Sequence, residues 1–586
     1  MSKRGWLALC LAFSSIAATA AERCTLSKFE IPVAMIGNRP VVKIGINGTQ
    51  VPLLVDSGAF FSFLSPAAAN QLKLKLSSLP FGMRIDGLAG EVEAQMTVVD
   101  RMQLQDGELP NIEFVVGGNE IGSGAMGILG RNILTMADIE YDLANGMIRI
   151  FFPKGDCGDT NFAYWAGDQP VVMLPLLRDL KRSPRAAIRA VAQINDKKIR
   201  VLFDTGATSM LALSAAQSAG IGKEQMKPAG RVRGGGRGSV DAWTAPLNTF
   251  VLGGETVSDI RIPVADFDLA DADMLLGIDF FLAHRIYISK GQRRMYFTHN
   301  GGPVFALSAT DMAKVRAAAA SAPASGEASE LDAAGYARRG AGSASRNDFI
   351  AALADLDQAC ALAPNEADYF VRRAVVHLAL RQGREAMQDF DAALNLAPTH
   401  TEALLKRAGM RLRSASDAAL ADLQTLDNTL PPQAHARLEM ARLYLRFDHT
   451  SEALVQLTHW IPTRDTDIEL PQVLNLRCRL RLKLGIELDG ALSDCDRAVD
   501  ADDKNASFRV SRGFLRLRRG EVDKAQSDFD KALKLKPDDP WSLYGRGIAR
   551  SRLGQAEAGR ADLDAARKLR PQIDADAVKK GLPAPG

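Results

Sequence analysis

The chain of 586 residues is too long for a single hydrophobic core, so we expect three or more domains. Hydrophobic residues make up 47% and charged residues 24%, which is the composition of an ordinary soluble globular protein. The formal net charge of +3 gives no reason to expect a nucleic-acid partner or binding to an anionic membrane surface.

Residues 1–20 have the pattern of an export signal. Lys3 and Arg4 precede an apolar stretch at 6–16, and small residues at 18–20 suit cleavage. The alternative is an uncleaved membrane anchor, but the apolar run is short for a span and no other stretch is long and apolar enough. We therefore expect an exported protein, periplasmic or secreted, without a stable membrane span after cleavage.

Cys24 and Cys157 lie on either side of the first half of the β-rich region, and we predict a disulfide between them if the compartment is oxidising. Cys360, Cys478 and Cys495 fall in a helical region, where we interpret them as small buried thiols, although the last two would lie on facing helices. The seven histidines are scattered and no cysteine pair has zinc-ligand spacing, so no metal site and no cofactor are predicted.

Residues 25–300 contain short apolar runs separated by turn residues, which predicts a β-rich region. A shift of 148 residues aligns Val51 with Ile199 and Asp56 with Asp204 without a gap. The region is therefore an internal duplication. We expect two similar lobes at 21–157 and 186–300. The stretch 158–185 joins them as a connector, with a cleavable or covering loop as the alternative.

The same short phrase follows an apolar strand in each lobe. Residues 55–59 read Val-Asp-Ser-Gly-Ala and residues 203–207 read Phe-Asp-Thr-Gly-Ala. An apolar pair and a glycine return 74 and 73 residues after the two aspartates, ending at Gly130 and Gly277. A lone Asp-Thr-Gly is usually an ordinary turn, so the joint recurrence of both elements is the informative observation.

These features together resemble the aspartic proteases, in particular a retropepsin-like branch of bacterial periplasmic type with two tandem lobes in one chain. Residues 127–134, Gly-Ile-Leu-Gly-Arg-Asn-Ile-Leu, are similar to the second half of a retroviral protease. The second copy departs from this pattern, because Ile278-Asp279 replaces Arg131-Asn132. The resemblance covers about 250 residues and leaves the C-terminal half outside.

The resemblance implies that Asp56 and Asp204 form a catalytic pair. Two carboxyl groups in contact cannot both ionise cheaply, so they would share one proton and activate a water molecule without a metal or a covalent intermediate. Because one chain carries both halves, a monomer suffices for the site. The expected supports of the active-site loops are Ser57, Gly58, Thr205, Gly206, Gly130 and Gly277.

Each lobe should also place a β-hairpin over the cleft. The candidate in the first lobe is 83–94, with turn residues Gly87 and Gly90, and in the second it is 232–243, which includes Gly235 and Gly236. A phosphate-binding loop is the alternative for the second glycine run, but a Lys-Ser/Thr ending and an obvious following helix are missing. We interpret both hairpins as mobile flaps.

Residues 301–332 are rich in Ala, Ser and Gly and are predicted to be a linker. A 34-residue period follows, resembling the tetratricopeptide repeat, in which small residues let paired helices approach and a proline ends each pair. We predict about six repeats over 333–571 and a C-terminal tail at 572–586. The prolines in phase are Pro364, Pro398, Pro432, Pro537 and Pro571.

The predicted fold is multidomain: an all-β bilobal aspartic-protease-like domain followed by an all-α solenoid of tetratricopeptide repeats. The predicted function is that of an exported aspartic endopeptidase, whose repeats recruit a protein or peptide substrate, or a protein partner, on their concave face. The alternative is an inactive protease-like scaffold that binds proteins through its repeats. The presence of both aspartates, both hydroxyls and both glycines favours the enzyme.

Overall fold

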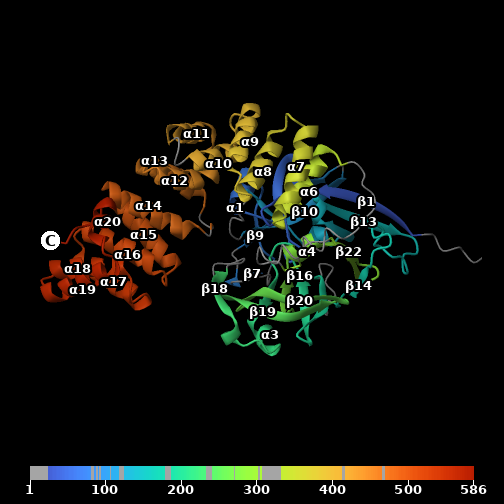
Figure 1. The fold of residues 1–586 in the computed structure, drawn as a ribbon, viewed down its shortest axis with the longest axis horizontal. Coiled ribbons are helices and arrows are strands. Elements are labelled where there is room, and N and C mark those ends of the chain that lie inside the picture. Colours follow the sequence, from blue (N-terminus) through green and yellow to red (C-terminus); the bar gives the residue numbers. More distant parts are fainter. Residues whose placement is uncertain are drawn as a thin grey trace, which may run out of the picture.

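The structure is a computed structural model in which two β-rich lobes are followed by a curved array of helices (Figure 1). It describes residues 24–80, 85–87, 90–91, 94–105, 107–117, 124–178, 187–232, 240–269, 271–300, 304–305, 331–411, 416–464, 467 and 469–585. The predicted signal at 1–20 and most of the predicted linker lie outside these residues. Among the described helices, none combines the length and apolar character that crossing a bilayer requires.

Each lobe is built around a closed barrel of six strands, and the two barrels share one topology. The first runs β3 (Arg39–Ile46), β4 (Thr49–Val55), β11 (Gly127–Leu129), β5 (Phe63–Leu64), β10 (Gly107–Gly117) and β9 (Ala94–Leu104), closing on β3. The second runs β15 (Arg189–Ile194), β16 (Lys197–Phe203), β21 (Met274–Leu276), β17 (Met210–Ala212), β20 (Glu255–Ala265) and β19 (Val240–Leu252), closing on β15. The predicted duplication is therefore a duplicated barrel.

The duplicated hairpins β3–β4 and β15–β16 turn in the same way. Asn47 and Gly48 have φ angles of 48° and 87°, and Asn195 and Asp196 have 45° and 65°. Two successive left-handed residues make the tight turn that matches the twist of antiparallel strands. This turn fixes the strand register that delivers each aspartate to the end of its strand.

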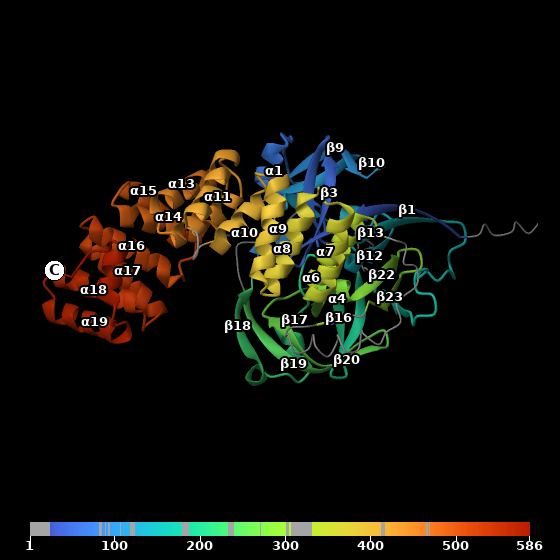
Figure 2. The same cartoon turned by 45° about the horizontal axis from the view of Figure 1, so that its top comes forward.

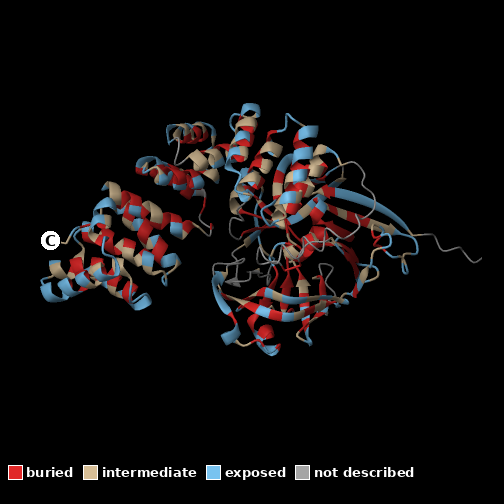
Figure 3. Ribbon diagram, in the orientation of Figure 1, coloured by how far each residue is buried: buried red, intermediate tan, exposed pale blue. Residues whose placement is uncertain are grey.

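A six-stranded antiparallel sheet joins the two lobes beneath the barrels. Its order is β1 (Thr25–Pro32), β13 (Met147–Lys154), β12 (Asp138–Asp142), β22 (His284–Ser289), β23 (Arg294–His299) and β14 (Val172–Pro175). The lobes meet at β12 and β22, where Tyr141 pairs with Ile286. One hydrophobic core continues through this sheet and both barrels, as the buried residues in Figure 3 show.

The stretch predicted as a plain connector at 158–185 contributes β14 to this sheet, so that boundary is corrected. Val172–Pro175 pairs with β23 as the counterpart of β1 in the other lobe. The strand is short and ends in proline, which removes the usual signature of a strand from the sequence. Upstream of it, Phe162 stacks on Tyr287 at 4.8 Å on the outer face of the sheet.

The C-terminal half consists of antiparallel helix pairs that stack side by side (Figures 1 and 2). Small residues make room for the partner helix: an added Cβ at Gly513 would lie 2.7 Å from the ring of Phe529. The pairs are α6 (Ala333–Ser345) with α7 (Phe349–Leu362), α8 (Ala367–Ala379) with α9 (Gly383–Leu396), α10 (Thr401–Arg411) with α11 (Ser416–Thr429), α12 (Ala436–Arg446) with α13 (Thr450–Trp460), α14 (Leu470–Leu484) with α15 (Leu488–Ala501), α16 (Ala506–Arg518) with α17 (Val522–Leu535), and α18 (Pro540–Arg552) with α19 (Ala556–Leu569).

The described residues therefore form seven helix pairs, and the expectation of about six repeats is wrong. The fourth pair ends in the short helix η3 (Ile461–Thr463) instead of an in-phase proline, so the period gives no boundary there. The predicted tail at 572–586 also needs correction. It begins with α20 (Ile573–Lys579), whose Ile573 and Ala577 are buried against the array.

The predicted disulfide between Cys24 and Cys157 is present and ties β1 to the segment that follows β13. Cys478 and Cys495 are bonded as well, which corrects their interpretation as separate thiols. They lie on the facing helices α14 and α15. Cys478 stands where other repeats carry Gly or Ala, and Cys495 stands where they carry Leu or Phe. Cys360 is buried and unbonded.

Candidate active site

Two loops, one from each barrel, bring Asp56 and Asp204 together where the lobes meet. Asp56 follows β4 directly and its amide donates to the carbonyl of Leu129 at 3.0 Å. Asp204 follows β16 and makes the equivalent bond to Leu276 at 2.8 Å. The two carboxyl groups are hydrogen-bonded to each other. Both residues remain partly exposed, which leaves the pair open to water.

The two loops are locked by reciprocal hydrogen bonds of Ser57 and Thr205. Each backbone amide donates to the hydroxyl oxygen of the other residue, at 3.0 Å in both directions. Each hydroxyl then donates across the interface, Ser57 to the carbonyl of Phe203 at 2.9 Å and Thr205 to that of Val55 at 2.8 Å. All four bonds are buried, so the separation of the aspartates is fixed by both lobes at once.

Gly58 and Gly206 permit this close approach. A Cβ added at Gly58 would lie 2.5 Å from the carboxyl carbon of Asp204, and one at Gly206 would overlap the carboxyl group of Asp56 in the same way. A side chain at either position would therefore force the pair apart.

Gly130 and Gly277 support the loops from behind. A Cβ at either residue would collide with the backbone of the active-site loop. Their amides donate to the hydroxyls of Ser62 and Ser209, at 3.0 and 2.9 Å. These two serines were not singled out from the sequence, although each stands five or six residues after its aspartate.

The second copy has Asp279 where the first copy has Asn132, and the two residues make equivalent hydrogen bonds. The side-chain oxygen of Asn132 accepts from the amide and hydroxyl of Ser62, both at 2.7 Å. Asp279 accepts from the amide and hydroxyl of Ser209 at 2.9 and 2.7 Å. Asp279 therefore replaces Asn132 in the same role, because an acceptor oxygen is what each loop requires.

The two carboxyl groups have unequal hydrogen-bond partners. Oδ1 of Asp56 accepts from the amides of Gly58 and Ala59, at 2.9 and 2.7 Å. Oδ1 of Asp204 accepts from the amide of Gly206 at 2.9 Å, and the amide of Gly58, which already donates to Asp56, acts on this carboxyl group as well. Amide donors stabilise the ionised form of a carboxyl group, so the better-supplied Asp56 is the better place for the negative charge.

The surrounding charges act in the same direction. Desolvation raises the pKa of Asp56, while the hydrogen bond from Asp204, the two amides and the charge of Arg131 oppose that rise. Desolvation and then the negative charge of Asp56 hold the pKa of Asp204 well above its ordinary value. The two carboxyl groups therefore titrate as a coupled pair that shares one proton, and the hydrogen bonds favour Asp204 as its carrier.

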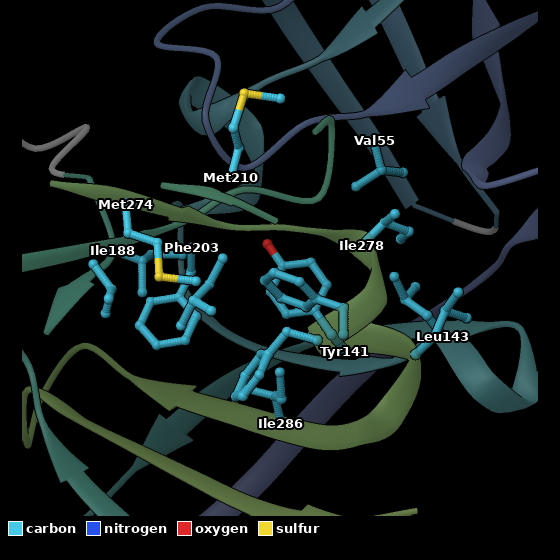
Figure 4. Packing of buried hydrophobic residues seen from close by; sticks show 14 of the residues in the cluster. Val55, Tyr141, Leu143, Ile188, Phe203, Met210, Met274, Ile278 and Ile286 are labelled. Carbon is cyan, nitrogen blue, oxygen red and sulfur yellow. The ribbon is translucent and has the colours of Figure 1, made fainter. Parts of the chain in front are cut away.

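Tyr141, on β12, lies beneath the locked loops and was missed in the sequence. Its ring is fully buried between side chains of both lobes, with Val55 on one side and Phe203 on the other (Figure 4). Burial, followed by the negative charge of Asp56, raises the pKa of its hydroxyl, so it stays neutral. No local pattern marks this residue, because only the pairing of β12 with β22 brings it under the site.

The flap candidates are described only in part. In the first lobe β7 (Asp86–Gly87) pairs antiparallel with β8 (Gly90–Glu91), so Gly87 and Gly90 lie on a hairpin. In the second lobe β18 (Lys227–Val232) pairs with β19 up to Val232 and Val240, and Gly235 and Gly236 lie outside the described residues.

Comparison with known proteins agrees with this geometry. Residues 42–133 and 190–280 each match the model of the aspartyl protease family. The two matched segments contain the two aspartates and end at the two glycine-containing elements behind them. No curated protein sequence matches the chain significantly.

Solved structures show weak likeness to separate halves of the chain. The tetratricopeptide repeat protein YrrB, described as having an unusual peptide-binding site, is 16% identical over 37% of this chain and 92% of its own, with a TM-score of 0.24. Basic 7S globulin from soybean is 13% identical over 47% and 95%, with a TM-score of 0.27. A tetratricopeptide repeat protein from Parabacteroides merdae is 20% identical over 44% and 91%, with a TM-score of 0.25.

Proposed function

Since the two lobes are an aspartyl protease domain and the helical array that follows has the 34-residue period of tetratricopeptide repeats, we propose that the protein is an exported aspartic endopeptidase. The observation that carries the proposal is the contact between the carboxyl groups of Asp56 and Asp204, held by the reciprocal bonds of Ser57 and Thr205. Both aspartates come from one chain, so a monomer provides the complete site.

The unequal environments of the two carboxyl groups define their roles. Asp56, as the ionised partner, takes a proton from a water molecule bound between the two groups, and the resulting hydroxide adds to the scissile carbonyl carbon. Asp204, as the protonated partner, donates to the carbonyl oxygen and neutralises the charge that develops there. The proton held by Asp56 then passes to the leaving nitrogen, and the proton on Asp204 is restored when the carbonyl re-forms.

Export is supported by the basic and apolar start of the chain and by the two disulfides. Disulfides persist in oxidising compartments and are rare in the cytosol, so a periplasmic or secreted location fits their presence. The helical array provides an extended surface next to the lobes, of the kind that repeat proteins use to hold a peptide or protein partner.

The first test is hydrolysis of an unfolded protein at mildly acidic pH by the mature chain. Asp56→Asn and Asp204→Asn should each lower turnover by about 10²–10⁴-fold, because each removes one half of the proton transfer. A statine-type transition-state analogue should inhibit the unaltered enzyme. The control is Asp273→Asn, which changes an aspartate of the same lobe that pairs with Arg200 at the surface.

Full activity in either Asn variant at the dyad would contradict the two-aspartate mechanism. A mature protein that binds a partner through its repeats but cleaves no peptide in a broad library would instead be a protease-like scaffold.

A further inference from the structure

Three potential metal ligands meet at one end of the second lobe, far from one another in the sequence. Glu255 begins β20, His284 begins β22 and His299 ends β23. The two histidines are direct cross-strand partners, and the ligand atoms of all three residues lie within 4.8 Å of one another. The expectation that the histidines form no cluster is therefore wrong, because strand pairing brings together residues that the sequence separates.

His284 is fully buried and its ring is held in one orientation. Its Nδ1 lies 2.8 Å from the carbonyl oxygen of Phe280, which can only accept, so Nδ1 carries the proton. The ring also stacks on Phe280 at 4.1 Å between centroids and meets Phe297 edge-on at 5.2 Å. A ligating histidine is typically fixed in this way, by donation of its other ring nitrogen to a carbonyl.

The orientation aims Nε2 of His284 at the carboxylate of Glu255, at 2.9 and 3.2 Å from its two oxygens. A lone pair facing a carboxylate is unfavourable unless a cation lies between them. For Glu255 and His284 by themselves, a proton on Nε2 would be a sufficient cation. The nearby ring of His299 is a third donor, which a proton does not require and a metal ion does.

We propose that Glu255, His284 and His299 bind a zinc ion, with a water molecule in the fourth position. Two imidazole nitrogens and one carboxylate oxygen are a ligand set that zinc accepts, whereas calcium and magnesium prefer oxygen ligands throughout. A tetrahedral zinc site needs ligand atoms about 3.3 Å apart, which side-chain rotation can reach from ligand atoms that all lie within 4.8 Å of one another. Glu255 is partly exposed and His299 is exposed, which leaves an entry path and room for the water.

The zinc ion would connect the barrel of the second lobe to the six-stranded sheet, since Glu255 belongs to the former and both histidines to the latter. The carbonyl that fixes His284 belongs to α4 (Ile278–Ala283). The first amide of α4 donates to the carbonyl of Ala207 at 2.8 Å, in the loop that carries Asp204. The ion would therefore stabilise the lobe around its active-site loop without touching the reacting atoms.

The test is zinc binding by the full mature protein after treatment with a chelator. Calorimetry should find one site, zinc should raise the melting temperature, and cobalt should give the intense visible spectrum of a four-coordinate site. His299→Ala and Glu255→Gln should each weaken zinc binding by at least about tenfold and remove the thermal shift. Calcium and magnesium should produce neither effect.

The matched control is His400→Ala. His400 pairs with Asp368 at 2.8 Å, but the described part of the chain offers this pair no third ligand. This variant should bind zinc as the unaltered protein does. Zinc binding that is absent, or that persists unchanged in both His299→Ala and Glu255→Gln, would overturn the proposal and leave a simple ion pair. These measurements do not depend on whether the protein cleaves peptides.

Discussion

At the scale of single residues, the surroundings of Asp204 favour its protonated form, and this lowers the stability of the fold near neutral pH. Its pKa is raised by desolvation and by the charge of Asp56, so the native state binds its proton more tightly than the unfolded chain does. Binding of this proton therefore contributes its full stabilisation below the pKa that Asp204 has in the unfolded chain. It is lost as the pH rises through the native pKa. Near neutral pH the site should destabilise the fold that contains it.

Asp204→Asn should therefore raise the melting temperature at pH 7 while removing activity. The amide is neutral at every pH, can donate to Asp56 and can still accept from Gly206. The gain should shrink as the pH falls toward 4, because the unfolded chain also begins to bind the proton near the ordinary pKa of an aspartate. Calorimetric melting curves from pH 4 to 8 would measure it.

Asp273→Asn provides a control of opposite sign. Desolvation acts on this carboxyl group too, but its bonds to Arg200 outweigh it and lower its pKa. Ionised Asp273 contributes stability above the pKa that it has in the unfolded chain, and this contribution is lost in acid. Asp273→Asn should therefore destabilise the protein at pH 7 and less so near pH 4. An Asp204→Asn variant that melts below the unaltered protein at pH 7 would contradict this account.

The residues of the site divide by whether the duplicated motif contains them. Ser57, Thr205 and the glycines could be named from the sequence because the duplicated phrase contains them. Tyr141 could not, because its contacts with both loops arise from strand pairing. The same holds for His284 and His299, whose proximity depends on the β22–β23 register. The duplicated motif identifies the residues that it contains even though their partners lie in the other lobe, and the strand topology adds the others.

At the scale of elements, ion pairs between arginines and buried aspartates run through the helical array. An arginine near the middle of the first helix of a pair binds an aspartate on the second helix, usually 16 residues later. The pairs are Arg339–Asp355, Arg373–Asp389, Arg407–Asp422, Arg477–Asp494, Arg512–Asp528 and Arg546–Asp562. In the fourth helix pair the buried Gln456 accepts from Arg437 instead. This is also the pair that ends in η3 without an in-phase proline.

Asp528→Ala should destabilise the array by about 3–5 kcal/mol, because it leaves Arg512 without its buried partner. The side chain of Asp528 is 2% exposed and accepts two bonds from Arg512, at 2.8 and 3.0 Å. Asp496→Ala removes another partner of the same arginine, but that side chain is 42% exposed and should cost less than about 1 kcal/mol. Denaturant unfolding followed by helical circular dichroism would compare the two. Equal losses of unfolding free energy in the two variants would show that burial does not determine how much these ion pairs contribute to stability.

At the scale of the whole molecule, the first helix of the array also belongs to the packing of the lobes. Ser345 Oγ donates to the carbonyl of Gly37 in the first lobe at 2.6 Å, and Arg346 donates to that of Leu282 in the second at 3.2 Å. Gly342 lies directly against Ala144. Figures 1 and 2 show α6 to α9 lying over the lobes while the later helices extend away. The array therefore has a fixed direction relative to the two lobes and their aspartate pair.

This fixed direction would affect catalysis if the array binds the protein substrate that the active site cleaves. A rigid connection then raises the effective concentration of the bound substrate at the active site. Gly342→Ala tests this, since the added Cβ would lie 2.5 Å from the carbonyl oxygen of Ala144 and must push α6 away. Small-angle scattering should then report a larger radius of gyration. Cleavage of an array-bound protein should fall several-fold, while cleavage of a short peptide should stay unchanged.

Gly409→Ala is the matched control, because its added Cβ would lie 3.7 Å from Leu443, an ordinary contact. Both changes stabilise a helix by about 1 kcal/mol, so they differ mainly at the interface with the lobes. An unchanged radius together with unchanged cleavage in Gly342→Ala would mean that the interface absorbs the methyl group. A larger radius of gyration with unchanged cleavage of the protein substrate would show that the array does not deliver the substrate to the active site. The array would then bind a protein partner instead.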